Sequence, residues 1–324
     1  MIHTEVLIVG GGPAGAACAW RLRRHGVACM ILDREAFPRL KLCAGWIPPE
    51  VFVDLDIDSS EYPHGLTRLP KMRYSVRGLK FALPSSQYAI RRFEFDHWLL
   101  ARADVPVETH HVRTITREQG AYVVDDAYSA NYLVGAGGTN CPVYRSLFSE
   151  IRPRSEDALI VTQEEEFPYA DSVDDLGKMC HLWFLEDGLP GYAWYVPKAE
   201  GYVNVGVGGK LTKLRARDDD IKRHWDRLVD KLAALGLVRG YEFRPKGHAY
   251  YLREEDGPVQ LDHAFIVGDA AGLATVDFGE GIGPAVKSGL LAADAIVTGD
   301  RYTVDSIRKR SVPQLLLGLL RRAY

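Results

Sequence analysis

The chain opens with a short apolar run that ends in a cluster of glycines. Residues 6–9 are continuously apolar and residues 10–12 are all glycine, which is typical of a buried strand followed by a tight turn. Residues 13–25 have the pattern of a helix that begins with small side chains, and Gly26 predicts its end. A second apolar run follows at residues 27–32. This pattern predicts a strand–helix–strand unit with parallel strands.

The rest of the chain alternates between strand-like and helix-like patterns, with a buried strand at residues 264–267 before a second glycine cluster. Arg77-Gly78 predicts a hairpin turn. Strand-like patterns occur in residues 66–91, 105–134 and 158–210. We expect short antiparallel strands at 105–134, and the region 158–210 is rich in aromatic residues. Helical periodicity is found in residues 93–103, 217–237 and 287–297.

The first glycine turn carries the pattern Gly10-x-Gly12-x-x-Gly15 at the strand-to-helix junction. Gly10 permits the tight turn, Gly12 lets the backbone approach a pyrophosphate, and Gly15 lets the helix pack closely on the strand. The helix N-terminus offers N–H groups to phosphates, and Asp33 ends the second strand, where it can accept a hydrogen bond from a ribose hydroxyl. The cofactor contacts predicted in this unit are Gly10, Gly12, Pro13, Ala14, Gly15, Asp33 and Arg34.

The second glycine cluster favours FAD over NAD. Gly268 and Asp269 follow a buried strand, and a carboxylate at a strand end supplies the acceptor that ribityl hydroxyls need. Gly281 and Ile282 precede the next helix. Backbone N–H groups there suit the flavin pyrimidine edge, where negative charge gathers on reduction. We therefore predict FAD as the cofactor, in contact with these four residues.

The combination of motifs resembles the FAD-dependent superfamily that contains p-hydroxybenzoate hydroxylase, flavin halogenases and geranylgeranyl reductases. The resemblance implies that Arg92, at the start of an Arg-x-x-Phe-Asp element, lies against FAD and that Val112 lies by the adenine. A further superfamily element, Gly-Ala-Asp-Gly, has Gly137 in place of the aspartate. That departure weakens a hydroxylase-type role for this turn.

The distribution of these motifs predicts the fold class and the domains. The glycine turns lie near both ends of the chain, and the aromatic strands lie between them. We expect an α/β protein with a Rossmann-like FAD-binding domain built from discontinuous segments and an inserted antiparallel β-sheet substrate domain. The predicted boundaries are 1–65, 92–150 and 255–324 for the FAD-binding domain, and 66–91 and 151–254 for the β-rich substrate domain.

An aromatic segment, residues 191–208, is similar to the Tyr-x-Trp-x-Phe-Pro…Gly-x-Gly motif of geranylgeranyl reductases, with Val196 at the Phe position. In that family the motif lines a cavity for a lipid chain. Alternation along a strand independently places Tyr192, Trp194 and Val196 on one face. We expect these three residues to form an apolar wall for the substrate, although a plain sheet core has the same pattern.

The segment at residues 38–45 resembles the Lys-x-Cys-Gly-Gly stretch that lies beside the flavin in the reductases, with Ala44 in place of a glycine. The resemblance implies that Cys43 and Ala44 contact FAD. Cys43 is the catalytic candidate, because a thiol at the flavin can donate a proton or tune the cofactor. A free cysteine that only packs is the alternative. Halogenases have Gly-Glu-Ser at this place, so Cys43 favours the reductases.

These observations predict an FAD-dependent reductase that acts on an apolar, isoprenoid- or lipid-like small molecule by hydride transfer through the flavin. One complete dinucleotide fingerprint is visible, so the electron donor is open between NAD(P)H and a redox protein. A flavin-dependent monooxygenase or halogenase is the alternative function. A non-catalytic FAD-binding protein is a third possibility.

The composition restricts the partners. The 324 residues carry a net charge of −3, which excludes nucleic-acid binding through a strongly basic surface as the main function. The five cysteines never form C-x-x-C, and His110 and His111 on a predicted strand point to opposite faces, so we predict no metal site. The run Glu164-Glu165-Glu166 predicts a solvated strand edge.

The chain has no run of the ~18 apolar residues that a spanning helix needs, and we therefore expect a cytoplasmic protein. Near the C-terminus, the apolar residues 315–320 lie between the basic runs 308–310 and 321–322. This pattern indicates either a terminal helix packed on the protein or a peripheral helix at the membrane surface.

Overall fold

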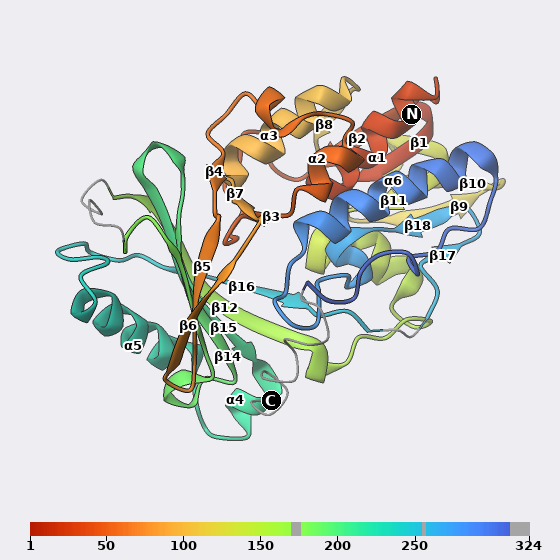
Figure 1. Ribbon diagram of the computed structural model, residues 1–324. Helices are drawn as coiled ribbons and strands as arrows, with labels where there is room; N and C mark the ends of the chain where they lie inside the picture. The colour runs from red at the N-terminus through yellow and green to blue at the C-terminus, as the bar shows by residue number, and fades with distance from the viewer. Residues whose placement is uncertain (170–175, 255–256, 312–324) are drawn as a thin grey trace.

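The computed structural model describes residues 1–169, 176–254 and 257–311. Two large β-sheets form the two halves of the molecule, each with helices beside it (Figure 1). The first sheet has eight strands, with the order β17-β18-β11-β1-β2-β8 and with β10 and β9 joined to β11. Its strands are β1 (Ile2–Val9), β2 (Cys29–Asp33), β8 (Val107–Thr109), β9 (Ile115–Glu118), β10 (Ala121–Val124), β11 (Tyr128–Gly135), β17 (Gln260–Leu261) and β18 (Ala264–Ile266).

Parallel pairing joins segments that lie far apart in the sequence. β1 pairs in parallel with β2 and with β11, β2 with β8, and β11 with β18. The continuous apolar run of β1 is buried, as expected for a central strand of a parallel sheet covered by helices. The prediction of antiparallel strands over residues 105–134 is wrong for β8, which pairs in parallel with β2. It holds for β9, β10 and β11, which pair antiparallel in succession, although β11 also pairs in parallel with β1 and β18.

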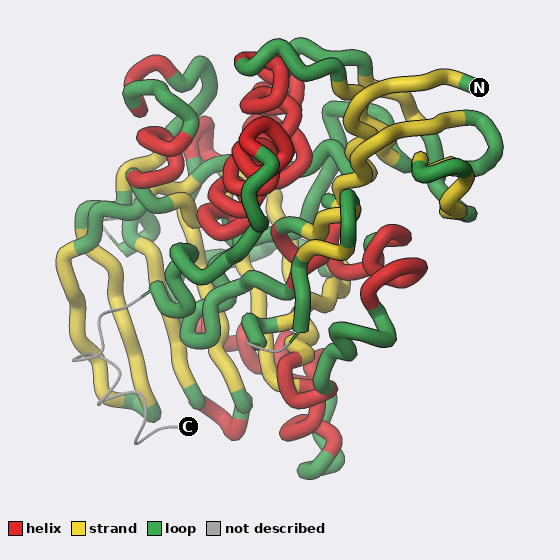
Figure 2. The backbone as a smooth tube through the Cα atoms, turned by 90° about the vertical axis from the view of Figure 1, so that its right-hand side faces the viewer, coloured by secondary structure: helices red, strands yellow, loops and turns green. Residues whose placement is uncertain are grey.

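Helix α1 (Pro13–Arg24) packs against α3 (Arg92–Ala103) and α6 (Ile282–Thr298). The contact with α6 is close because Gly289 has no side chain: a Cβ there would lie 2.1 Å from the Ala14 carbonyl oxygen. In the side view of Figure 2, the packed helices of this half lie side by side next to strands. Helix α6 begins five residues earlier than predicted, because its first turn tolerates Pro284.

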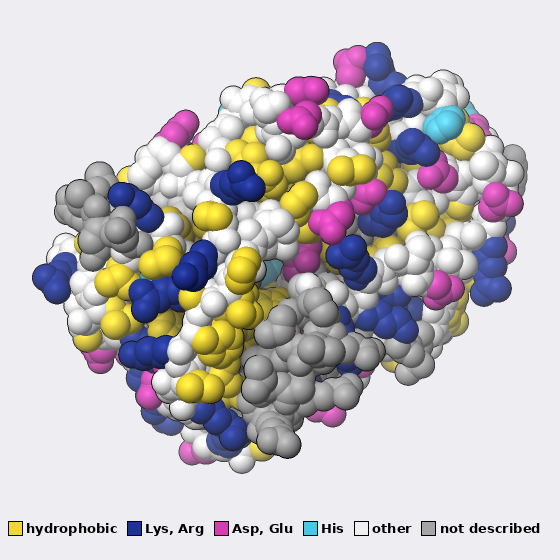
Figure 3. All heavy atoms as spheres, viewed as in Figure 1, with side chains coloured by type: hydrophobic (Ala, Val, Ile, Leu, Met, Phe, Trp, Pro, Cys, Tyr) yellow, Lys and Arg dark blue, Asp and Glu magenta, His cyan; other side chains and the backbone are white. Residues whose placement is uncertain are grey.

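The second sheet has seven strands in the order β16-β12-β15-β14-β13-β5-β6. These strands are β5 (Lys71–Val76), β6 (Leu79–Pro84), β12 (Leu159–Pro168), β13 (Cys180–Phe184), β14 (Gly191–Pro197), β15 (Tyr202–Lys210) and β16 (Lys246–Tyr251). All pairs are antiparallel except the parallel pair β13–β5, which joins two different inserted segments. Hydrophobic side chains gather on its outer surface around β5 and β6 (Figure 3).

The two faces of the seven-stranded sheet contact different parts of the protein. On β15, Val203, Val205 and Val207 are buried in a cluster with helix α5 (Ile221–Ala234). The alternate residues Asn204 and Gly206 face the opposite side, toward Trp194. Helix α5 starts at Ile221, later than the pattern predicts, because the Asp220 carboxylate accepts a hydrogen bond from Lys222 N and caps the helix.

Smaller elements connect the two halves. β3 (Trp46–Ile47), β7 (Tyr88–Ala89) and β4 (Thr67–Arg68) form a three-stranded sheet at the junction, and α2 (Glu50–Asp54) and α4 (Leu211–Arg215) are single short helices. The predicted turn at Arg77-Gly78 joins β5 and β6. The predicted α/β class, with discontinuous Rossmann-like segments and an inserted, mainly antiparallel sheet, is confirmed.

Within the described ranges, no helix is both long enough and apolar enough to cross a membrane. The apolar run at residues 315–320, on which the predicted membrane-surface helix depends, lies outside the described residues.

Candidate functional site

A cavity of about 410 Å³ takes its lining from both sheets and from the loop after β2. One wall is the glycine turn after β1, and another is the turn after β18 together with the start of α6. The aromatic strand β14 forms a third wall. The predicted site residues that line the cavity are Gly10, Gly12, Pro13, Ala14, Asp33, Arg34, Cys43, Ala44, Arg92, Val112, Tyr192, Trp194, Gly268, Asp269, Gly281 and Ile282.

Two predicted site residues lie beside this cavity without lining it. A Cβ on Gly15 would stand 1.9 Å from the Gly10 carbonyl oxygen, so this glycine permits the close packing of helix on turn. Val196 is completely buried, in a cluster with Trp46 and Trp194. Its side chain lies on the same sheet face as Trp194 but beneath the surface of the wall.

Two helix N-termini open on the cavity. Gly12 is the N-cap of α1 and Gly281 is the N-cap of α6, and neither helix has a side-chain cap. The N–H groups of a first helical turn have no partner within the helix, and they form the positive end of the helix dipole. The cavity therefore offers two separate places that favour negative charge.

Asp33 ends β2 and shapes the turn beside it. Its carboxylate accepts hydrogen bonds from Gly11 N at 2.7 Å and from Glu35 N at 3.0 Å. The Arg39 guanidinium lies 3.9 Å from the same carboxylate. These contacts fix the carboxylate at the cavity edge, so that a ribose hydroxyl would meet a preorganised acceptor.

Arg92 supplies a fixed positive charge. Its guanidinium binds the fully buried Asp96 carboxylate through two hydrogen bonds of 2.6 and 2.7 Å. Burial opposes the charged form, but Asp96 outweighs it and raises the pKa of Arg92. The nearby Cys43 side chain also contributes to the rise in the pKa of Arg92. The cation thus lies between helix α3 and the loop that carries the catalytic candidate.

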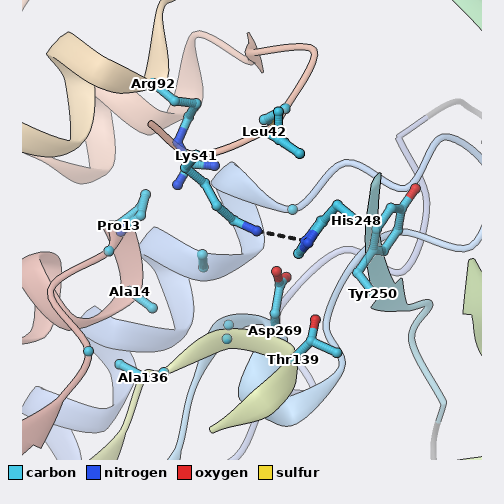
Figure 4. A pocket seen from close by; sticks show the side chains of 18 of the residues that line it. Pro13, Ala14, Lys41, Leu42, Arg92, Ala136, Thr139, His248, Tyr250 and Asp269 are labelled. Carbon is cyan, nitrogen blue, oxygen red and sulfur yellow. Dashed lines mark hydrogen bonds between the residues drawn. The ribbon is translucent and has the colours of Figure 1, made fainter. Parts of the chain in front are cut away.

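A lysine and a histidine meet across the cavity (Figure 4). Lys41 Nζ lies 2.6 Å from His248 Nε2, and the Asp269 carboxylate points toward the pair. Burial lowers the pKa of both groups, and the Lys41 charge helps to lower the pKa of His248 to about 4. A neutral imidazole can accept a hydrogen bond from the ammonium, and Asp269 favours that charged form of Lys41.

The loop that holds Cys43 is attached to the seven-stranded sheet. Gly45 N donates a hydrogen bond to Cys43 Sγ at 3.3 Å, and Lys198 Nζ donates one to the Cys43 carbonyl oxygen at 3.5 Å. Gly45 has a φ of +77°, and a Cβ there would collide with the Ile90 carbonyl oxygen. This close approach explains the requirement for glycine two residues after the cysteine.

The acidic run on β12 contradicts the predicted solvated edge. Since β12 lies between β16 and β15, it is an inner strand. Glu164 is only 3% exposed and lines the cavity. Glu166 forms an ion pair with the buried Lys198 at 2.6 Å. Glu165 faces the other side, where its carboxylate accepts a hydrogen bond from the Tyr241 hydroxyl.

Burial raises the pKa of Glu164 to about 7, although Lys198 and a hydrogen bond from Asn204 oppose the shift. A carboxyl group with a pKa raised in this way can hold a proton near neutral pH. Among the residues that the sequence did not single out, Glu164 is therefore the one with the clearest capacity for acid–base chemistry.

The histidine pair lies just after β8 and not on a strand as predicted. His110 Nε2 is 2.7 Å from the Asp125 carboxylate, and both histidines border the cavity. The described part of the chain contains no group of three or more side chains suited to holding a metal ion.

Comparison with known proteins supports the interpretation of the cavity. A family model described as an FAD binding domain matches residues 3–41. An uncharacterized protein of Methanosarcina barkeri is 30% identical over 342 residues, which cover 97% of this chain and 81% of the relative. Digeranylgeranylglycerophospholipid reductase 1 of Methanopyrus kandleri is 27% identical, over 90% of this chain and 80% of the relative.

The chain belongs to the geranylgeranyl reductase family of FAD-dependent oxidoreductases. The crystal structure of a geranylgeranyl bacteriochlorophyll reductase-like protein of Thermoplasma acidophilum has the same fold as this chain, with a TM-score of 0.78 and 21% sequence identity. The superposition covers 100% of this chain and 84% of that protein.

FAD is the cofactor of this reductase-family enzyme, and the described residues fit it. A Cβ on Gly12 would meet no atom closer than Arg39 Nη2 at 3.5 Å, so the approach to the α1 N-terminus is open. The uncapped turns of α1 and α6 suit the pyrophosphate and the anionic edge of a reduced flavin. Asp269 also lines the cavity and provides a hydrogen-bond acceptor there.

Sequence reasoning did not single out several polar residues of the cavity, Glu164 and His248 among them, although one signal was available. Residues 203–208 alternate valine with asparagine or glycine, which indicates one packed face and one face kept clear of bulky side chains. The strand that pairs with this clear face carries Glu164. Lys41 begins the Lys-x-Cys segment, but no local pattern distinguishes His248 or shows that the two meet, because they become partners only through the fold.

Proposed function

We propose that this FAD-dependent enzyme reduces carbon–carbon double bonds of an isoprenoid or similarly apolar chain. The observation that carries the proposal is one continuous cavity. It runs from two uncapped helix N-termini, where FAD fits, to the aromatic face of β14. The reductase from Methanopyrus kandleri is named for a digeranylgeranyl lipid, whose unsaturated chains have the chemistry that such a wall accommodates.

The residues proposed to hold FAD follow the order of the cofactor's own groups. The α1 N-terminus with Gly12 would receive the pyrophosphate, and Asp33 and Val112 the adenosine end. Asp269 would accept hydrogen bonds from the ribityl chain, and Gly281 at the start of α6 would face the flavin ring. When bound, FAD supplies the two-electron redox chemistry. The chain orients both molecules and excludes water from the site.

Asp269→Ala is expected to weaken FAD binding without changing the fold. A hydrogen bond to a charged group is worth about 1.5–3 kcal/mol, so the dissociation constant should rise roughly ten- to hundred-fold. Titration of FAD into flavin-free protein, followed by fluorescence, measures this change. Asp294→Ala is the matched control, since Asp294 on α6 pairs with Arg21 on α1. An unchanged constant for the Asp269 variant would exclude contact with the ribityl chain.

The substrate is proposed to lie against Tyr192 and Trp194, with Val196 packing beneath them. In this proposal, one domain binds FAD and the other binds the substrate. The FAD-binding domain comprises residues 1–65, 92–150 and 255–324, and the substrate domain comprises residues 66–91 and 151–254. Cys43 is proposed to act at the flavin from the loop between the two, where its side chain lies near enough to Arg92 to affect the pKa of the guanidinium. An external donor, NAD(P)H or a redox protein, would supply the electrons.

A single-turnover experiment tests the function. The protein is reduced with dithionite without oxygen and is then mixed with a geranylgeranyl lipid. We expect the flavin absorbance of the oxidised form to return as the lipid gains two hydrogen atoms per double bond, measured by mass spectrometry. Mixing with oxygen should restore the oxidised spectrum without modifying any organic compound. Oxygen-dependent hydroxylation or halogenation, with the lipid unchanged, would instead support the monooxygenase or halogenase alternative.

A further inference from the structure

One acidic side chain stands directly beside the proposed substrate wall. In the sheet register, Glu164 on β12 is paired with Gly206 on β15, which is paired in turn with Trp194 on β14. A Cβ on Gly206 would lie 2.2 Å from Trp194 Cζ2 and 2.7 Å from Glu164 Cβ. The missing side chain at Gly206 therefore lets Glu164 and the Trp194 ring approach each other over the same strand.

A buried hydrogen-bond chain holds the acid in this place. Trp194 Nε1 donates to Asn204 Oδ1 at 2.7 Å, and Asn204 Nδ2 donates to Glu164 Oε2 at 3.4 Å. Asn204 is 1% exposed. The neighbouring Lys198 is engaged by Glu166 at 2.6 Å. Because Lys198 has its own carboxylate partner, Glu164 is not required to balance that charge.

We propose that Glu164 is the acid that delivers a proton to the substrate during double-bond reduction. This inference rests on the proposed function. Saturating a carbon–carbon double bond requires a hydride, for which the reduced flavin is the source, and one proton. The Glu164 O–H bond breaks, a C–H bond forms at the second alkene carbon, and the electron pair of the O–H bond stays on the carboxylate. Solvent returns the proton after product release.

The electrostatic surroundings suit this role. Burial raises the pKa of Glu164 to about 7, so a substantial fraction is protonated at neutral pH. The charged groups that act on it are Lys198 after β14, Lys41 in the loop after β2, and Glu166 on its own strand. From β16, the exposed Lys246 is its register partner. The protonated acid is the active form, so the rate of substrate reduction should fall as the pH rises through the folded-state pKa.

The decisive comparison uses single-turnover kinetics of FAD-loaded protein with a geranylgeranyl lipid. Glu164→Gln keeps the size and a hydrogen-bonding oxygen but cannot deliver a proton. We expect substrate reduction to slow by roughly 10²–10⁴-fold, with unchanged dithionite reduction of the flavin and no decline of the rate above neutral pH. Glu164→Asp, which keeps a carboxyl group, should retain an intermediate rate and the pH dependence. Glu165→Gln is the matched control and should behave as the wild type.

Infrared difference spectroscopy of substrate-free protein supplies a readout that does not depend on turnover. A protonated-carboxyl band that titrates near neutral pH should be present in the wild type and in Glu165→Gln. Glu164→Gln should lose the Glu164 contribution selectively and keep the separate one of Glu280, whose pKa burial raises to about 6. Thermal unfolding establishes that each variant is folded. If Glu164→Gln does not fold, the Glu164→Asp variant is used for the test instead.

The outcomes separate this inference from the proposed function. If the wild type does not reduce the lipid at all, the proposed function is wrong and the inference with it. If the wild type reduces the lipid and Glu164→Gln does so at the same rate and with the same pH dependence, the inference alone is overturned. A lost pH dependence in Cys43→Ala, with normal behaviour in Glu164→Gln, would assign proton delivery to the thiol.

Discussion

Gly12→Leu should fold normally and fail to bind FAD. The φ of Gly12 is −69°, which any residue adopts, and a Cβ there meets no atom closer than 3.5 Å. A leucine is therefore tolerated by the protein itself. Its side chain would project into the cavity at the N-terminus of α1, along the path that the pyrophosphate must take. The loss of FAD binding should be complete at concentrations that saturate the wild type.

Two controls make this experiment specific. Gly247→Leu places the same side chain at an exposed glycine of β16, where the nearest atom is 3.6 Å away, and FAD binding should be retained. Gly15→Leu should instead prevent folding, because its Cβ would overlap the Gly10 carbonyl oxygen. The measurements are flavin absorbance after reconstitution and thermal unfolding. A folded, yellow Gly12→Leu protein would show that the pyrophosphate does not approach α1.

Trp194→Ala should weaken the binding of long-chain ligands much more than that of short ones. Each CH₂ group that is buried against an apolar wall contributes about 0.8 kcal/mol, so a lipid gains affinity with every added methylene that reaches the wall. Removing the indole eliminates the contact only for chains long enough to touch it. Affinities of a series of prenyl lipids, measured by quenching of flavin fluorescence, should therefore lose their dependence on length, with FAD binding intact.

The neighbouring strand offers a matched control for the loss of stability. Trp183 on β13 is buried on the opposite face of the same sheet, against α5. Replacing a buried tryptophan with alanine costs about 3–5 kcal/mol at either position, but only Trp194 lines the cavity. Trp183→Ala should keep the dependence on chain length. An equal loss for long and short ligands in Trp194→Ala would mean that this face does not hold the chain.

The sequence was sufficient for those parts of the protein that local chemistry decides. The first glycine turn could be assigned its role because the backbone of Gly10, with a φ of +118°, and the contact at Gly15 allow no side chain. A carboxylate that directly follows a strand or ends it, as at Asp33 and Asp269, lies at the carboxyl edge of the sheet, where the cofactor of such a fold binds. Helix α1 begins at Pro13 as expected. FAD, the α/β class and the reductase family follow from these local patterns and from the motifs around Cys43 and Trp194.

Strand partners were decided by the tertiary structure, because pairing joins residues far apart in the chain. The alternation at residues 105–134 shows that strands are present, but does not show that β8 and β11 pair in parallel with β2 and β1. The burial of Glu164 has the same origin: the run of three glutamates looks solvated until β16 and β15 flank it.

The chemistry of the cavity also depends on contacts that the fold creates. Lys41 and His248 are 207 residues apart and become partners only when the loop after β2 meets β16. The pKa of Glu164 depends on burial, on Asn204 and on Lys198, which arrive from two other segments. Sequence determines which groups can bind or titrate. The low-dielectric interior that shifts their pKa values exists only after distant segments have packed together, and so the tertiary structure decided which of these groups face one another across the cavity.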